Sequence, residues 1–267
     1  WSARTKAASR TDAIQTCIES VMVVRWRTMD TSRRPPRAEA AVVAELPVAQ
    51  LPEGQIGPRS APQDPSWAIL GPWDDPLASR EHGRAEAGKQ RTEHNGEPVI
   101  EWTTAGQRTQ ERALITGEST WREYSVVCRF EPLQKGSTPT HDDPFGRCAR
   151  AGLVFRMQTL RQYYLFGVED LRRLVLWRRR DTEWHELAAR EIDAPRVPIT
   201  LRVYLVADGI RAECPELGVC FHATDTDCRS GATGFRARGR CRLYDLRVLA
   251  TPGQKRVNHA LARERKD

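Results

Sequence analysis

Two neighbouring strand-like segments carry an arginine, a tyrosine and a carboxylate at positions that could share one surface. They are AGLVFR, which ends at Arg156, and QYYLFGVE, which contains Tyr163 and ends at Glu169. Side chains alternate between the two faces of a strand, so if Phe155 and Tyr164 face a core, the first three residues project together from the other side. Ring stacking on the tyrosine and charge-assisted hydrogen bonds from the other two would suit a saccharide. The competing interpretation is a cross-strand ion pair beside a half-buried tyrosine.

A second charged string, DTEWHEL, places Trp184 between Glu183 and His185. A carboxylate and an imidazole could act as an acid–base couple against a sugar-stacking ring. The more common arrangement is an exposed strand end with the tryptophan packed into the core. Trp184 is therefore a candidate for carbohydrate binding, with a core position as the alternative.

Asp225 and Asp227 lie in the run TDTD, ahead of a glycine-containing turn. Closely spaced carboxylates in a turn can bind calcium, which makes these two residues the candidate metal ligands and calcium the candidate cofactor. Aspartate and threonine also form ordinary turns without a metal.

A catalytic row is missing from the sequence. A sandwich glycosidase needs carboxylates in the pattern E-x-D-x-x-E on one strand, and the nearest string is EIDAPR. Glu191 and Asp193 keep the spacing, but Arg196 stands where the general acid would be and Pro195 interrupts the strand. No G-x-S-x-G, H-E-x-x-H, phosphate-loop or dinucleotide motif occurs either. We therefore assign no catalytic residue.

The elements that must position these residues are strands. From Trp121 to Ala250 short apolar runs alternate with polar turns, and no helix-length periodic segment intervenes, which predicts an antiparallel all-β sandwich. Further strands are expected at 96–104 and 112–117, with Asn95 and Gly96 as a turn.

The order of these elements resembles a concanavalin A-like jelly roll of the laminin-G and 3-keto-disaccharide hydrolase type, a group that includes family-66 carbohydrate-binding modules. The resemblance covers roughly the C-terminal half of the chain, from GESTWREYSVVCRFEPL (117–133) through QYYLFGVE to GATGFRARGRCRLYDLRVL (231–249). It implies an all-β fold, an antiparallel two-sheet jelly-roll sandwich with an irregular N-terminal extension. A fold of this kind specifies chemistry poorly.

The implied function is carbohydrate recognition by a module of a polysaccharide-processing protein, with an oligosaccharide or polysaccharide as the partner. One alternative is a glycoside hydrolase or lyase of the 3-keto-disaccharide hydrolase-like type. Another is a protein-interaction sandwich of the laminin-G type. The missing catalytic row favours binding over hydrolysis.

Composition divides the chain into three parts. Residues 1–66 are expected to form an extension that can contain one short helix at 12–24, followed by a proline-rich linker with seven prolines at 31–66. Residues 67–251 form the sandwich, with Trp67 and Trp73 docked at its edge, and 252–267 form a frayed basic tail. No apolar run is long enough to span a membrane. Because the chain begins with Trp rather than Met, we expect an incomplete N-terminus.

The formal net charge of +7 raises the question of nucleic acid. Arg236, Arg238, Arg240 and Arg242 alternate with small and apolar residues, so one strand would turn all four to a single solvated face. No aromatic residues are interleaved with them on that face, as single-strand nucleic-acid binding would require. We predict no nucleic-acid partner.

Six of the seven cysteines fall within the predicted sandwich, which permits disulfides and a secreted or periplasmic protein. A turn centred on Leu217 would place Cys214 opposite Cys220, where the thiols could join. The alternative is buried free thiols, for which Cys128 and Cys241 have the apolar parity.

Overall fold

The computed structural model describes residues 40–46, 48–50, 54–55, 89–102, 111–133 and 149–264. The helix predicted at 12–24, the edge segment at Trp67 and Trp73, and most of the proline-rich stretch lie outside these residues. Within the part of the chain that the structure describes, no helix is long and apolar enough to cross a membrane.

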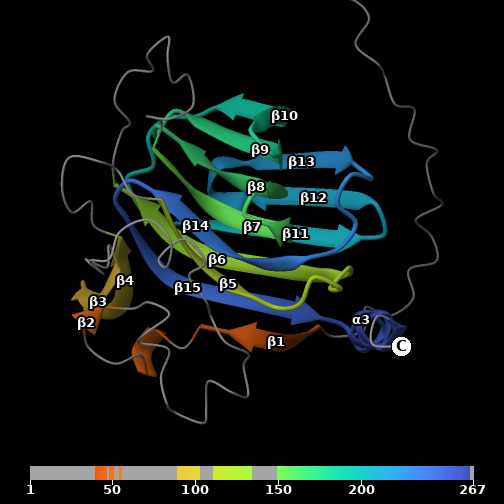
Figure 1. The fold of residues 1–267 in the computed structure, drawn as a ribbon. Helices are drawn as coiled ribbons and strands as arrows, with labels where there is room; N and C mark the ends of the chain where they lie inside the picture. Colours follow the sequence, from red (N-terminus) through yellow and green to blue (C-terminus); the bar gives the residue numbers. More distant parts are fainter. Residues whose placement is uncertain are drawn as a thin grey trace, which may run out of the picture. The chain divides into compact units, whose positions relative to one another are not determined.

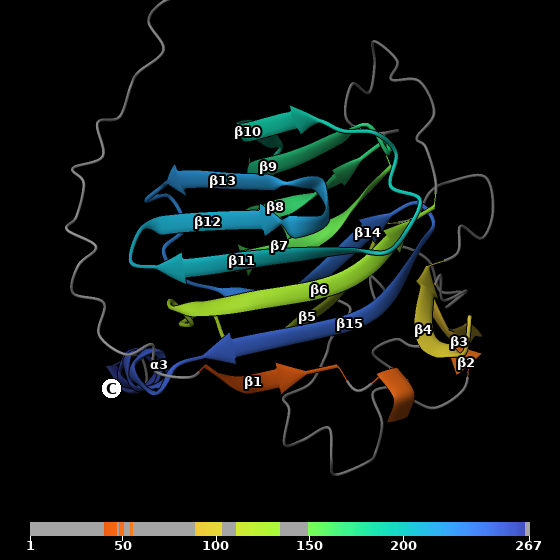
Figure 2. The ribbon, with the colours of Figure 1, turned by 180° about the vertical axis from the view of Figure 1, so that it is seen from behind.

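The described strands form two antiparallel sheets, which we name A and B (Figures 1 and 2). Sheet A has the order β13-β12-β11-β6-β15-β4-β3-β2, and β1 also pairs with β15. Its strands are β1 (Ala41–Glu45), β2 (Gly54–Gln55), β3 (Lys89–His94), β4 (Glu97–Trp102), β6 (Tyr124–Pro132), β11 (Ile199–Val206), β12 (Gly209–Cys214), β13 (Val219–Thr224) and β15 (Cys241–Ala250).

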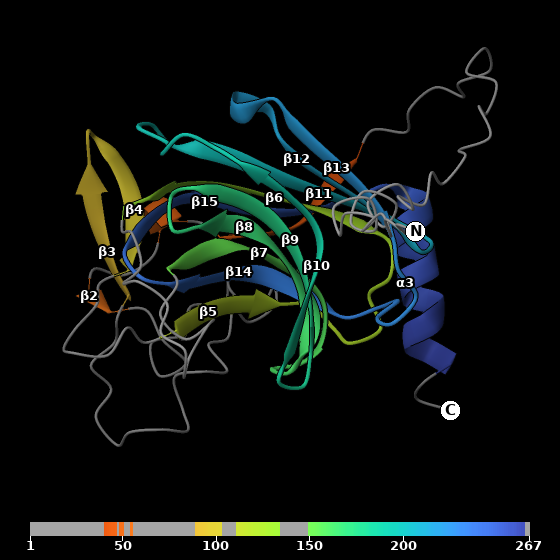
Figure 3. The ribbon, with the colours of Figure 1, turned by 90° about the horizontal axis from the view of Figure 1, so that it is seen from above.

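Sheet B has the order β10-β9-β8-β7-β14-β5. Its strands are β5 (Glu111–Thr116), β7 (Arg150–Thr159), β8 (Gln162–Glu169), β9 (Arg173–Arg180), β10 (Glu183–Glu191) and β14 (Ala232–Arg238). Viewed from above, the two sheets form two layers (Figure 3). The described elements are completed by two 3₁₀ turns, η1 (Val48–Gln50) and η2 (Pro215–Leu217), and by the helix α3 (Pro252–Glu264).

The core lies between the sheets and follows from period-2 alternation. Every second residue of β6 is buried, starting at Tyr124. The predicted inward positions of sheet B are confirmed, since Leu153, Phe155, Tyr164, Phe166 and Val168 all belong to this core. Aromatic rings pack edge to face within this core. The ring centre of Phe235 lies 5.2 Å from the ring centres of both Trp102 and Phe130.

The predicted turn between β3 and β4 is confirmed. Asn95 and Gly96 have φ angles of 55° and 79°, and the flanking residues pair as a hairpin. A two-residue turn with both φ angles positive matches the twist of the strands it joins, and Asn-Gly accommodates it at low cost.

Both predicted ends of the sandwich need correction. Strand β1 lies inside the segment predicted as linker, yet it pairs with β15 along Ala41–Glu45, so the sandwich begins well before residue 67. At the other end the predicted frayed tail contains helix α3. The Asn258 side chain fixes this helix by accepting a hydrogen bond from the backbone N–H of Arg122 at 2.9 Å and donating one to the carbonyl of Glu123 at 3.1 Å.

The four alternating arginines do not share one face, because the chain turns at Gly239 (φ 103°) between β14 and β15. Arg236 and Arg238 belong to sheet B, and Arg236 is buried. Arg240 and Arg242 ion-pair with Glu101, and Arg242 also pairs with Glu131 at 3.0 Å. The prediction of a single solvated arginine face is wrong, because the run spans two sheets.

The predicted pairing of Cys214 with Cys220 is also wrong. The 3₁₀ turn η2 and Gly218 set the hairpin register so that Cys214 faces Val219, and Cys220 faces Glu213. A shift of one residue moves a side chain to the other face of a sheet. Cys214 is buried in the core, Cys220 is exposed, and both are free thiols. The alternative is confirmed for Cys128 and Cys241, which are buried and free.

Candidate functional site

The first predicted site residue, Arg156, is fully buried. The pairing of β7 with β8 shifts between Phe155 and Thr159, and Arg156 has a φ of +48°, so the strict alternation ends there. Its guanidinium donates to the carbonyls of Ala207 and Gly209 in the β11–β12 turn. The prediction that it projects with Tyr163 is therefore wrong.

Tyr163 faces away from sheet A, as its parity predicts, but it is also fully buried. It belongs to a second apolar cluster on the outer face of sheet B, made of Ala113, Ile115, Val154, Met157, Tyr163, Leu165, Val175 and Trp177. Its hydroxyl accepts hydrogen bonds from Arg236 and, at 3.1 Å, from Arg179. An exposed stacking ring at this position is ruled out.

Glu169 lies at the far end of the same strand in a buried ion pair. Its carboxylate accepts from Arg150 Nε at 2.7 Å and from Arg173 at 3.1 Å. The cross-strand ion pair considered as the alternative does form, but with Arg150 instead of Arg156, because Arg150 is the residue directly opposite Glu169.

Trp184 is half-buried and packs against this second cluster. Its ring meets those of Tyr163 and Trp177 edge-on at 5.8 and 6.1 Å, and the guanidinium of Arg150 lies 4.9 Å from its centre. The structure thus brings Trp184 together with Tyr163, and it links Glu169 to them through Arg150. Glu183 and His185 pair with each other at 3.3 Å, but alternation puts them on the opposite face from Trp184.

Asp225 and Asp227 lie in the connection between β13 and β14, where both contact Arg178. Its Nη1 lies 2.8 Å from Asp225 and 3.0 Å from Asp227. Asp225 also accepts from the hydroxyl of Tyr164 and from the backbone N–H of Asp227, each at 2.8 Å. Among the described residues no group of three His, Cys, Asp or Glu side chains has metal-binding geometry. Calcium binding here stays a prediction.

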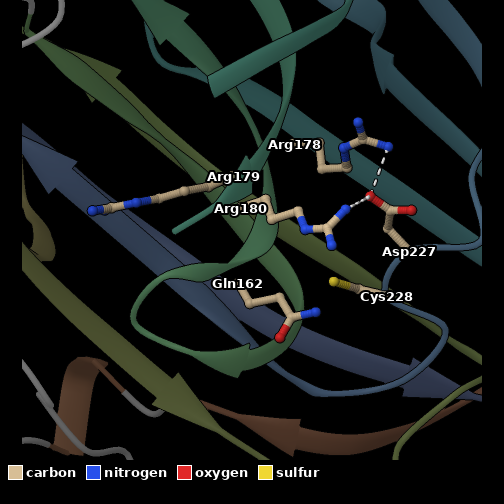
Figure 4. Close-up of a pocket in the computed structure, with 6 residues that line it drawn as sticks. All are labelled: Gln162, Arg178, Arg179, Arg180, Asp227 and Cys228. Carbon is tan, nitrogen blue, oxygen red and sulfur yellow. Dashed lines mark ion pairs between the residues drawn. The ribbon is translucent and has the colours of Figure 1, made fainter. Parts of the chain in front are cut away.

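Next to this loop is a cavity of about 110 Å³, which we call the arginine pocket. Its lining comes from the start of β8, the end of β9 and the β13–β14 connection: Gln162, Arg178, Arg179, Arg180, Asp227 and Cys228. Gln162 and Arg180 are paired across the two strands. Arg178 and Arg180 both reach toward Asp227, while Arg179 points away from it (Figure 4).

Residues at the pocket contact both apolar clusters, the core between the sheets and the second cluster on the outer face of sheet B. Arg179 donates to the hydroxyl of Tyr163 and lies 5.3 Å from the ring centre of Trp184 on the outer face. On the inner face, Tyr164 is part of the core and holds Asp225. Burial, together with this hydrogen bond, raises the pKa of Tyr164, and burial raises the pKa of Cys228. The phenol and the thiol therefore stay neutral near pH 7, and the arginines and aspartates carry the charge.

Sequence reasoning found Asp225, Asp227 and Trp184 at or beside this site, but it missed the arginines. Arg178, Arg179 and Arg180 stand in one strand, RLVLWRRR, as three consecutive charged residues after an apolar run. Consecutive charged residues after an apolar run indicate that the strand passes from the core to the surface. This pattern in the sequence predicts exposed arginines at the end of β9.

No protein-family model matches the chain, and no curated protein matches it. Solved structures do show likeness in fold. The carbohydrate-binding module CBM66 from Bacillus subtilis aligns at 8% identity over 60% of this chain and 91% of its own, with a TM-score of 0.44. The topology of the described residues is that of a two-sheet antiparallel β-sandwich.

Two further structures align over more of the chain. Domain 4 of AbnA, a GH43 extracellular arabinanase from Geobacillus stearothermophilus in complex with arabinotriose, is 14% identical over 83% of this chain and 98% of its own, with a TM-score of 0.46. The catalytic domain of a laminarinase from Thermotoga petrophila RKU-1 is 10% identical over 80% and 99%, with a TM-score of 0.45. Likeness at this level concerns the fold and assigns no ligand.

Proposed function

We propose that this jelly-roll sandwich is a carbohydrate-recognition module and that its ligand is bound at the arginine pocket. The observation that carries the proposal is the pair of contacts from Arg178 to Asp225 and Asp227, at 2.8 and 3.0 Å, beside an open cavity. One guanidinium thereby fixes two carboxylates before any ligand arrives. Sites that are rigid in advance lose less entropy on binding.

The lining of the pocket suits sugar hydroxyls. Gln162 offers an amide with both donors and an acceptor, Arg180 offers a planar fork of donors, and Asp227 offers acceptors. Each hydroxyl of a sugar is both donor and acceptor, so a mixed set of this kind can satisfy neighbouring hydroxyls. The three side chains stand on strand ends or on a loop fixed to the core through Tyr164.

The ion pairs of the two aspartates favour binding over hydrolysis. A glycosidase needs one carboxyl group that carries a proton for the leaving group and a second that is free to act as base or nucleophile. At the arginine pocket both Asp225 and Asp227 are engaged by Arg178. Neither is placed to act as a general acid.

The test is a glycan array with the whole chain, followed by calorimetry on the best ligand, with arabino-oligosaccharides and β-1,3-glucans included. We expect binding of at least one glycan that Gln162→Ala weakens about tenfold, as the loss of one or two hydrogen bonds to the ligand would do. The control is Gln90→Ala, an exposed residue on β3 and outside the pocket. Failure to bind any glycan, or equal binding by parent and Gln162 variant, would contradict the proposal. Release of reducing ends from the bound glycan would show an enzyme instead.

A further inference from the structure

The size of the arginine pocket limits what can enter it. Its volume is about 110 Å³, and one water molecule needs roughly 10–15 Å³ of cavity volume measured in this way. The pocket therefore holds several waters and has room for a substituent of a sugar, such as a carboxylate or sulfate group.

Two of the arginines that line the pocket, Arg178 and Arg180, reach toward Asp227, while Arg179 points away from it (Figure 4). Arg178 already holds both neighbouring acids, Asp225 at 2.8 Å and Asp227 at 3.0 Å. Arg180 therefore only shares Asp227 with Arg178 and has no carboxylate of its own at the pocket.

Arg180 is the arginine best placed to meet an anion. Its nearest Asp227 oxygen is 3.9 Å away, at the limit of an ion pair, and its side chain is 66% exposed. Guanidinium groups bind carboxylate and sulfate-type oxygens through two parallel hydrogen bonds, which an ammonium cannot reproduce.

We infer that the arginine pocket binds an oxyanion substituent of the glycan, a uronate carboxylate or a sulfate ester, and that Arg180 is its principal contact. The inference rests on the proposed function and makes it specific: the module selects acidic polysaccharides. Arg180 forms a bidentate contact with the anion at the mouth, Gln162 donates its amide to the same group or to a neighbouring hydroxyl, and Asp227 orients Arg178.

The experiment compares polymers that share a backbone and differ in whether they carry anionic groups. Polygalacturonate is set against its fully methyl-esterified form, and dextran sulfate against dextran, each titrated into the whole chain by calorimetry at low and high salt. Inorganic sulfate and acetate are titrated separately to measure binding of the free anions. We expect an acidic polymer to bind at least tenfold more tightly than its neutral counterpart, and high salt to weaken that binding.

Three variants assign the effect to the pocket. Arg180→Gln should lower the affinity for the acidic polymer about tenfold or more, which corresponds to one lost charge-assisted hydrogen-bonding group. Arg180→Lys keeps the charge but not the fork and should recover only part of the affinity. Arg202→Gln, an equal loss of charge at an exposed position on sheet A, should bind like the parent. Since Arg180 is largely exposed, all three variants should fold.

The outcomes separate the inference from the proposed function. Equal binding of acidic and neutral polymers, weakened by Gln162→Ala, would overturn the acidic specificity and leave carbohydrate recognition intact. No binding of any polymer would overturn both, even if inorganic sulfate bound. Acidic binding that Arg180→Gln and Arg202→Gln weaken alike would show a diffuse charge effect and overturn the assignment to the pocket.

Discussion

The hydroxyl of Tyr164 donates a hydrogen bond to Asp225 across 2.8 Å, and this contact joins the core of the sandwich to the loop that lines the arginine pocket. Tyr164 is fully buried between the sheets, stacked on Phe155 at 5.5 Å. Its oxygen also accepts from the backbone N–H of Cys228 at 3.3 Å. The phenol in the core therefore helps to position the loop, together with Arg178.

Replacing Tyr164 with phenylalanine should lower the free energy of unfolding by about 1–3 kcal/mol, because Asp225 and the N–H of Cys228 both lose a buried partner. The ring remains, so no large cavity forms. Urea unfolding followed by fluorescence would measure the change. The control is Tyr204→Phe, on the half-buried outer side of β11, which should stay within about 0.5 kcal/mol of the parent. An unchanged Tyr164→Phe protein would show that the loop is held by other contacts.

Tyr163 and Phe166 should be similarly important for stability although they face opposite sides of sheet B. Both are fully buried, so replacing either with alanine should cost about 3–5 kcal/mol, the usual loss for a large buried ring. Chemical denaturation of both variants, with the exposed Val206→Ala as control, would check this. A Tyr163→Ala variant as stable as the parent would restore the surface role that the sequence suggested.

Much of the fold could be predicted from the sequence because the two sheets share one core. Alternation alone placed Phe155, Tyr164 and Phe166 inside, and Asn95-Gly96 marked a hairpin turn. These patterns are local and depend only on the two-residue period of a strand. The resemblance of the strand order to jelly rolls predicted that the strands form two packed sheets, which is confirmed.

The site was predicted less well because it depends on departures from that period. The pairing of β7 with β8 shifts after Phe155, and this shift turns Arg156 inward. No residue in AGLVFR predicts such a shift. The alternation of side chains correctly placed Tyr163 on the outer face of sheet B. It could not show that other side chains cover this face and bury the ring. Strand β1 was missed because the surrounding prolines indicated a linker.

The stability of the domain should fall as the pH rises above about 9, first because the buried thiols keep protons that the unfolded chain releases, and above 10 because buried tyrosines do the same. Burial raises the pKa of Tyr124 from 10 to about 12 and raises that of Tyr164 as well. Between pH 10 and 12 the unfolded chain releases these protons and the folded chain keeps them, so the unfolded state binds fewer protons and is favoured. The loss should be roughly 1 kcal/mol per pH unit for each such tyrosine, measured as urea midpoints from pH 9 to 11.5. Tyr124→Phe should flatten the slope, and an equally steep slope in that variant would contradict this assignment.

Calcium should leave the stability unchanged if Asp225 and Asp227 remain engaged by Arg178, because a cation would have to displace the guanidinium from both. Thermal unfolding with millimolar calcium and with a chelator would measure this. Arg178→Gln in the same assay is informative, since it frees both carboxylates and should create or strengthen any response to calcium. A stabilisation of several degrees in the parent would instead support the calcium site that the TDTD run suggested.

Four of the five described thiols of the sandwich, all except Cys228, should differ sharply in reactivity. Cys220 is exposed, with its sulfur 3.4 Å from His222 Nε2, while Cys128, Cys214 and Cys241 are buried and burial raises their pKa values, that of Cys214 to about 12. The thiolate is the reacting species, so a buried neutral thiol reacts slowly.

Labelling the native protein with a thiol reagent, followed by peptide mapping, should therefore modify Cys220 within minutes and the other three only on unfolding. Urea provides the control, since in denaturant all four should react at one rate. Because Cys214 and Cys220 point to opposite faces of the β12–β13 hairpin, a non-reducing map of protein made in an oxidising compartment should contain no peptide that links them. A linked 214–220 peptide would show that the hairpin register is one residue away from the one described, with Cys220 turned toward the core.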